Sequence, residues 1–71
     1  MTEEEFLLGL GKRIASYRKK KKLSQLALSI ESGIAKSYIS ELEKGRRNPT
    51  VTTLLKLVKP LGVKVSTLMP K

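Results

Sequence analysis

Apolar residues recur every three or four positions along much of this chain, which is the spacing of one buried face of an α-helix. The first series consists of Phe6, Leu10, Ile14 and Tyr17. Thr2 and Glu5 stand just before it at capping-box spacing, and a basic run follows at the end of a helix, where cations are favoured. The pattern predicts a first helix at about residues 3–21. Gly9 and Gly11 lie within it and lower its stability by up to about 1 kcal/mol each relative to alanine.

The middle of the chain predicts two short helices joined by a tight turn. Ser24 is a favourable N-cap for the first of them, and Gly33 stands where a glycine commonly ends a helix. The second is expected from about Ala35 to Lys44, and Gly45 ends it in the same way. Two helices so close together have the outline of a helix-turn-helix, here at about residues 24–44, in which the second helix enters the major groove of DNA.

A fourth helix and a final turn complete the pattern. Thr50 is the expected N-cap of this helix. Its apolar residues are Val51, Leu54, Leu55, Leu57 and Val58. Pro60 has no N–H to donate and is expected to end or kink the helix just before it. Ser66 is expected to cap a last turn that holds Leu68 and Met69.

The composition favours a single all-α domain. The chain has 71 residues, of which only three are aromatic, and this disfavours a β-sheet. A chain of this length forms one domain, here residues 1–71, with a small core. The expected helices therefore pack as one unit.

Charge and residue usage narrow the chemistry. Fifteen Lys and Arg against six Asp and Glu give a formal net charge of +9, which favours a polyanion such as DNA, RNA or an anionic membrane surface. Because Cys and His are absent, disulfides, thiolate nucleophiles, Cys-based zinc sites and the commonest general base are excluded. No enzyme activity, metal site or cofactor is expected. A cytoplasmic protein is expected, since no segment reaches the length of a membrane span and the acidic N-terminus is unlike a signal peptide.

The expected third helix has an inner and an outer face. The side that can bury carries Ala35, Ile39 and Leu42. The opposite side carries Lys36, Ser37, Ser40, Glu41 and Lys44. A helix lying against base edges requires short or polar residues of this kind, whereas an ordinary solvated face is the alternative.

Several motifs together resemble a known family. They are Leu23-Ser24-Gln25, Leu28, Gly33, the run from Tyr38 to Gly45, Arg47-Asn48-Pro49-Thr50, and Leu57 to Val63. With these motifs the chain resembles the lambda-repressor-like (Cro/CI, Xre) helix-turn-helix family over about residues 10–68. It is especially similar to restriction–modification controller proteins from Tyr38 to Asn48. The resemblance implies a compact five-helix domain that binds DNA sequence-specifically and is often a dimer.

The resemblance also implies roles for individual residues. The base-facing residues would be Lys36, Ser37 and Glu41. Gln25 would hold a phosphate or help position the third helix. The residues near the DNA backbone would be Tyr38, Ser40, Lys44, Arg46, Arg47 and Asn48. Arg18 and Glu43 match a structural ion pair that ties the first helix to the third.

The chain departs from the family pattern at five positions. Ser29 replaces the usual alanine between the second and third helices, and Ala35 replaces the usual polar cap of the third. Leu26 and Ile30 occupy usually polar positions of the second helix, either as isolated exposed residues or as a partner surface. Pro60 lies where the fourth helix normally continues.

Two functions fit this interpretation. The first is a transcriptional regulator, expected to be a repressor, that binds a near-palindromic operator as a homodimer built from the end of the fourth helix and residues 61–69. The second is the antitoxin of a toxin–antitoxin pair, which binds operator DNA and a protein toxin. An exposed, contiguous surface at Leu26 and Ile30 would favour the antitoxin. A non-specific binder of RNA or membranes would not require a two-sided third helix, and no membrane association is expected.

Overall fold

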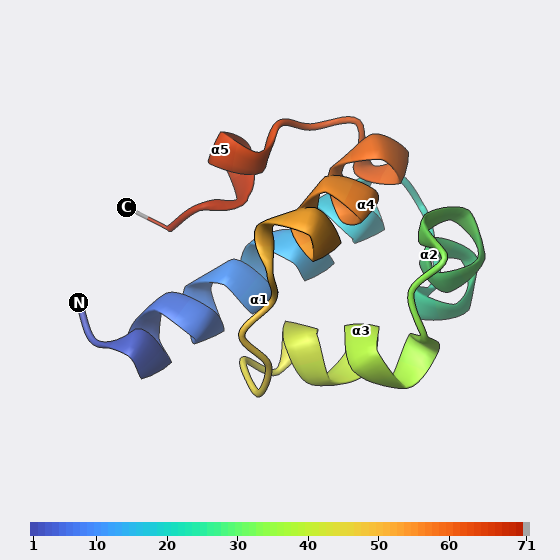
Figure 1. The fold of residues 1–71 in the computed structure, drawn as a ribbon. Helices are drawn as coiled ribbons and strands as arrows, with labels where there is room; N and C mark the ends of the chain where they lie inside the picture. The colour runs from blue at the N-terminus through green and yellow to red at the C-terminus, as the bar shows by residue number, and fades with distance from the viewer. Residues whose placement is uncertain (71) are drawn as a thin grey trace.

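The computed structural model describes residues 1–70 as five α-helices around one core (Figure 1). The helices are α1 (Glu3–Lys20), α2 (Gln25–Ser32), α3 (Lys36–Glu43), α4 (Val51–Leu61) and α5 (Val65–Leu68). The second helix of the helix-turn-helix, α3, packs against both α1 and α2, while α4 packs against α2 and α5. Residues 1–70 contain no β-strand, so the predicted compact all-α domain of five helices is confirmed.

The helices begin at the capping residues that the sequence predicts. The Thr2 hydroxyl accepts a hydrogen bond from the Glu5 N–H (3.1 Å), and the Glu5 carboxylate accepts one from the Thr2 N–H (2.9 Å). Ser24 and Thr50 accept in the same manner at the starts of α2 and α4. Gly33 adopts the left-handed conformation at the end of α2, with φ 75°. These local signals fix where the chain turns.

Two predicted boundaries are wrong. Pro60 does not end α4, which continues through Leu61 to a left-handed glycine. The proline lies in the last turn, where only one helical residue follows it, and burial of Leu57 and Leu61 holds that turn in place. Ser66 does not cap the final turn either, because α5 begins one residue before it and has no side-chain cap. Burial of Leu68 holds α5 against the core instead.

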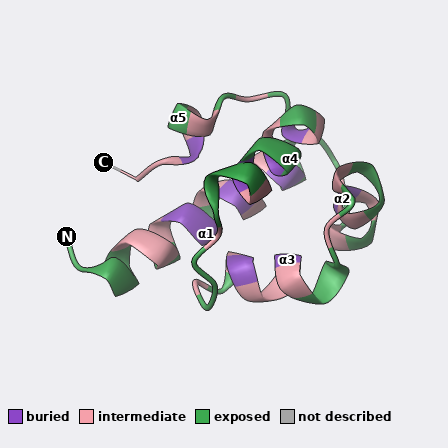
Figure 2. Cartoon of the chain, viewed as in Figure 1, coloured by how far each residue is buried: buried purple, intermediate pink, exposed green. Residues whose placement is uncertain are grey.

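The core consists entirely of leucine and isoleucine side chains, and every helix contributes at least one (Figure 2). Its members are Leu10, Ile14, Leu28, Ile39, Leu42, Leu54, Leu57, Leu61 and Leu68. Leu61 and Leu68 are only 2% and 0% exposed. The predicted dimer contact at residues 61–69 is therefore wrong for these two residues, which are already buried within one chain.

The crossing of α1 and α3 depends on Gly11, which is buried. A Cβ added at this position would meet the backbone carbonyl oxygens of Leu42 and Glu43, the latter at 2.7 Å. Carbonyl oxygens in a helix cannot rotate away as a flexible side chain can. The glycine that weakens α1 by propensity is therefore required by the packing of α3 against it.

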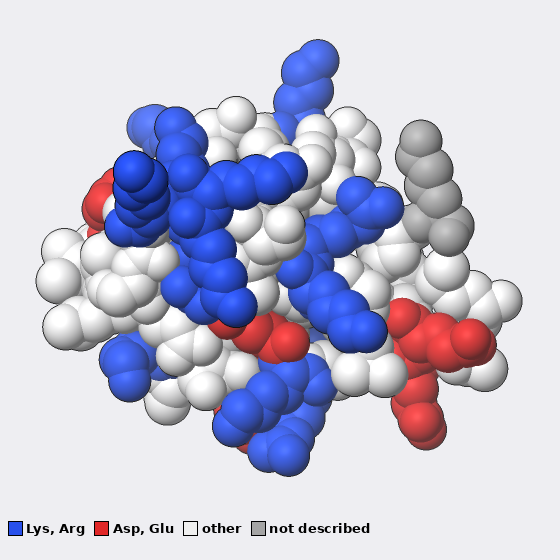
Figure 3. Space-filling view, turned by 180° about the vertical axis from the view of Figure 1, so that it is seen from behind, with Lys and Arg blue, Asp and Glu red and all other residues white. Residues whose placement is uncertain are grey.

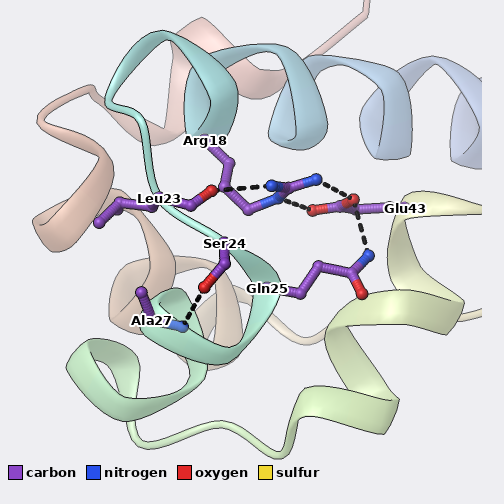
Figure 4. A network of polar contacts seen from close by, with 6 residues as sticks. All are labelled: Arg18, Leu23, Ser24, Gln25, Ala27 and Glu43. Atoms are coloured by element: carbon purple, nitrogen blue, oxygen red, sulfur yellow. Dashed lines mark hydrogen bonds and ion pairs between the residues drawn. The ribbon is translucent and has the colours of Figure 1, made fainter.

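An ion pair joins α1 to the end of α3 (Figure 4). Arg18 Nε donates to Glu43 Oε2 (2.7 Å), and Arg18 Nη2 donates to Glu43 Oε1 (3.0 Å). The third contact of the guanidinium is a hydrogen bond from Nη1 to the Leu23 carbonyl oxygen (2.8 Å). Arg18 therefore holds both α3 and the connection to α2, and the predicted structural pair is present.

The Arg18–Glu43 ion pair is almost completely shielded from solvent. The side chains of Arg18 and Glu43 are 11% and 8% exposed. Hydrogen bonding to the Glu43 carboxylate raises the pKa of the Arg18 guanidinium, although burial acts in the opposite direction. Glu43 Oε1 also accepts a hydrogen bond from Gln25 Nε2 (3.0 Å), so the carboxylate is bonded from two sides. A buried carboxylate satisfied in this way fixes the position of the helix that carries it.

We expect Gly11→Ala to lower the free energy of unfolding by about 1–3 kcal/mol, because the overpacked backbone contact outweighs the better helix propensity of alanine. Urea denaturation followed by circular dichroism measures the change. Ser16→Ala is the control, since Ser16 is exposed on the same helix and only propensity changes there. A Gly11→Ala variant as stable as the parent would show that α3 does not need this close approach.

We expect Arg18→Met to lower the free energy of unfolding by about 3–5 kcal/mol, because Glu43 then stays buried without its cation. The double variant Arg18→Met/Glu43→Leu should recover most of this loss, since neither charge remains. Denaturant unfolding of the single and double variants forms the cycle. Additive effects of the two substitutions would contradict a coupled buried pair.

Candidate nucleic-acid interface

The exposed side of α3 is polar from its first turn onward. Lys36 and Ser37 are exposed, whereas Ile39 and Leu42 on the opposite side are fully buried. Ala35 is the N-cap and makes no side-chain cap hydrogen bond, so no side chain covers the first N–H groups of this helix. The predicted division of this helix is confirmed for the buried Ile39 and Leu42 and for the exposed Lys36 and Ser37. It is wrong for Ala35, which was expected on the buried side but is exposed, because it is the N-cap that precedes the first turn.

Glu41 lies between two cations at the end of α3. Its Oε2 atom is 3.4 Å from Arg46 Nη1 and 4.0 Å from Lys44 Nζ. Among residues 1–70 no ion pair joins Glu41 to Lys36. Exposed pairs of this kind stabilise a fold by only about 0.2–1 kcal/mol. Their effect is local, because they neutralise the carboxylate and gather two positive charges beside it.

Gln25 is half-buried, and its side-chain amide nitrogen points toward Glu43 (Figure 4). Its amide nitrogen donates to Glu43 (3.0 Å), the same carboxylate that Arg18 holds. Of the two roles implied for Gln25, the structure therefore displays the positioning of α3. Contact between Gln25 and a phosphate stays a prediction.

The loop after α3 keeps its basic residues in solvent but close to the helix. Arg46, Arg47 and Asn48 are all exposed. The Arg47 guanidinium carbon lies 5.4 Å from the centre of the Tyr38 ring, within the range of a cation–π contact. Tyr38 is half-buried against the core, so its ring provides a fixed platform for the arginine. Ser40, also expected near the DNA backbone, is half-buried on α3.

Two polar residues of α4 lie beside α3 and were not expected at the site. Thr53 and Lys56 line an open cavity of about 240 Å³ together with Ile34, Ala35 and Tyr38. Their spacing of three residues places them on one side of α4, and that spacing is the signal that could have identified them. The pattern of α4 draws attention to its apolar residues instead.

Positive charge dominates one side of the molecule (Figure 3). The exposed run Lys19–Lys22 lies at the C-terminal end of α1, while Glu3, Glu4 and Glu5 lie exposed at the opposite end of the same helix.

Within residues 1–70 no group of three or more potential metal-ligating side chains comes together. None of the helices in that range has the length and apolar character needed to cross a bilayer.

Two pairs of large apolar side chains are exposed. Leu26 and Ile30 on α2 are 55% and 74% exposed, and Val51 and Leu55 on α4 are 66% and 53% exposed. Each pair is four residues apart and therefore lies on one face of its helix. The sequence pattern counts Val51 and Leu55 among the apolar residues of this helix, and in the structure both face solvent.

The comparisons with known proteins agree with this geometry. The family model described as helix-turn-helix matches residues 14–68. The chain is 46% identical over 54 residues to an uncharacterized HTH-type transcriptional regulator, y4dJ, of Sinorhizobium fredii. This alignment covers 76% of this chain and 70% of that protein.

Two solved structures are similar over most of the chain. The restriction–modification controller protein C.AhdI from Aeromonas hydrophila gives a TM-score of 0.86 at 35% identity and covers 89% of this chain and 96% of that one. SinR, the master regulator for biofilm formation, was solved in complex with DNA. It gives a TM-score of 0.81 at 42% identity and covers 83% of this chain and 95% of that one. The resemblance to lambda-repressor-like regulators and to controller proteins is confirmed, and the chain belongs to the helix-turn-helix family.

Proposed function

We propose that this protein is a sequence-specific DNA-binding transcriptional regulator that represses by occupying its operator. The observation that carries the proposal is the exposed polar face of α3, which the Arg18–Glu43 pair fixes in position and which basic residues flank at its end. A rigid helix of this kind can lie in the major groove, where each base pair presents a distinct pattern of donors and acceptors. This function operates on the chromosome, so the cytoplasm is the expected compartment.

Two residues on the face of α3 are the proposed main base readers. Lys36 can donate to O6 and N7 of guanine, and Glu41 can accept from N4 of cytosine. Ser37 is exposed beside Lys36 in the first turn and is the third proposed base-facing residue. Because Glu41 is paired with Lys44 and Arg46, we infer that its carboxylate approaches DNA with its charge already neutralised.

A second set of residues is proposed to position the protein without reading sequence. It comprises Gln25, Tyr38, Ser40, Lys44, Arg46, Arg47 and Asn48. Contacts to phosphate stabilise binding to all sequences alike, whereas a good base contact discriminates by about 1–3 kcal/mol. The two sets of residues therefore predict different effects of substitution.

We expect Lys36→Ala and Glu41→Ala to change the preferred bases at defined operator positions. Arg47→Ala should instead weaken binding to all sequences by a similar factor. Selection from random duplexes with each variant measures both effects, and Arg47→Ala serves as the matched control. If the Lys36 and Glu41 variants retain the parent consensus and lose only affinity, α3 does not read bases through these residues. If the parent selects no consensus, the proposed function itself is wrong.

We also propose that the protein binds a near-palindromic operator as a homodimer. The exposed pair Val51 and Leu55 on α4 supports an apolar contact, because Leu61 and Leu68 are used in the core. A two-fold dimer would place its two α3 helices in half-sites about 34–36 Å apart.

We expect Leu55→Glu to dissociate the dimer and to weaken operator binding at least tenfold, which corresponds to about 1.4 kcal/mol. Leu55 is 53% exposed, so the variant should fold as the parent does. Sedimentation equilibrium and DNA titration measure the two effects. Leu26→Glu is a matched control, since Leu26 is 55% exposed on α2. A Leu55→Glu variant that remains dimeric would show that the dimer interface does not include Leu55.

An antitoxin that also binds a protein toxin is the second candidate function. The observation in its favour is the exposure of Leu26 and Ile30 on one face of α2, as an apolar partner surface requires. Co-purification with the products of neighbouring genes, with the parent and with Ile30→Lys, tests this candidate. Retention of such a product by the parent and its loss from Ile30→Lys would favour the antitoxin. No retention by the parent would leave operator binding as the whole function.

A further inference from the structure

We propose that the exposed lysines of α1 bind the phosphate backbone of duplex DNA beyond the base pairs that α3 reads. This proposal rests on the proposed DNA-binding function and adds a second surface to it. We define the lysine face as Lys12 and Lys19 of α1 together with Lys22, which follows the end of that helix; all three are exposed.

The lysine face lies next to the side of α1 that packs on α3. Gly11 meets the backbone of α3, and Arg18 reaches Glu43 at its end. Lys12 directly follows Gly11, and Lys19 directly follows Arg18. Each lysine therefore lies about 100° around the helix axis from a residue that contacts α3. They are about two turns apart on the same exposed side. The face therefore borders the proposed interface rather than lying opposite to it.

The other lysines of the run are used within the domain. Lys20 Nζ lies 4.8 Å from the centre of the Tyr17 ring. Lys21 packs against Gly62, with its Nζ 3.2 Å from where a Cβ would stand, and so places a cation at the C-terminal end of α4. These two contacts account for Lys20 and Lys21 as parts of the fold.

Among the described residues, the lysine face takes part in no ion pair and in no contact like those of Lys20 and Lys21. The ion pairs found within residues 1–70 involve Arg18, Lys44 and Arg46. Three uncompensated lysines on a chain of net charge +9 repel one another and the rest of the molecule. An external polyanion would remove that repulsion.

Continuity with the proposed phosphate contacts makes duplex DNA the occupant. Lys22 lies two residues before Ser24, the N-cap of α2, and Arg18 bonds the carbonyl oxygen of the intervening Leu23. Along α1, Lys12 and Lys19 are separated by a rise of about 10 Å, so the two side chains can reach different phosphates of one DNA strand. A backbone that passes Gln25 can therefore continue over α1.

The experiment compares two duplexes that share one operator selected from random sequence. The short duplex ends at the selected consensus, and the long duplex adds about 10 base pairs of arbitrary sequence to each end, a length that exceeds the 31 Å long axis of the domain. Affinity is measured between about 50 and 200 mM salt for the parent and for Lys12→Gln/Lys19→Gln. Lys59→Gln/Lys64→Gln is the matched control, since it removes the same charge from exposed positions outside α1.

We expect the parent to bind the long duplex more tightly, with a log–log salt slope steeper by about 2 per subunit, as one added phosphate contact each from Lys12 and Lys19 requires. Its advantage on the long duplex should shrink about tenfold for each subunit across this salt range, and therefore at least about a hundredfold for a bound dimer. Lys12→Gln/Lys19→Gln should lose this advantage, bind the short duplex no more weakly than the control, and retain the parent consensus.

Three results would overturn the proposal. The first is equal parent affinity for the two duplexes, and the second is an equal loss of the advantage in the control variant. The third is unchanged DNA binding by Lys12→Gln/Lys19→Gln together with loss of binding to phosphatidylserine vesicles, which would assign the face to a lipid surface. A parent that binds neither duplex would instead refute the proposed function.

Discussion

The bonding of the Glu43 carboxylate is the constraint on which the arrangement of the other helices depends. Arg18 from α1 and Gln25 from α2 both donate to it, so the three elements that form the candidate interface meet at one anion. A charge this deeply buried is tolerated only when its hydrogen bonds are complete, and the described residues leave no buried polar side-chain atom without a partner. Any rotation of α3 about its axis would break these bonds.

Apolar packing sets the distance between the helices, and the ion pair sets their direction. Gly11 allows α1 and α3 to approach closely, while Ile39 and Leu42 fill the space beneath α3. A domain of 71 residues buries a smaller fraction of its surface on folding than larger domains do, so each contact carries more of the stability. The rigidity of α3 therefore results from a few contacts that are nearly dry.

The six acidic residues of this basic chain are unevenly placed. Glu3, Glu4 and Glu5 lie in the first turn of α1, where they complement the helix dipole at a distance from α3. The side chain of Glu43 is buried, Glu41 is paired with Lys44 and Arg46, and Glu31 is exposed on α2. The surface next to α3 thus keeps its positive character although two of the six acids belong to that helix.

Sequence alone determined the local structure of this protein and the type of its site. Capping residues and the apolar period were enough to predict the helices, since each signal acts within about one or two turns. The motifs around Gln25 and from Tyr38 to Asn48 were enough to predict the helix-turn-helix family. The polar outer face of α3 also follows from periodicity, because burial of one side of a helix exposes the other.

The tertiary structure decided which residues meet and therefore what each one does. It turned Gly11 from a weak position into a required one, kept Pro60 inside α4, buried Leu68 in the core and left Leu55 exposed. It also gave Glu41 its partners and Gln25 its bond to Glu43. Propensity and period describe a helix by itself, whereas these outcomes depend on a neighbouring helix whose distance and rotation no local signal contains.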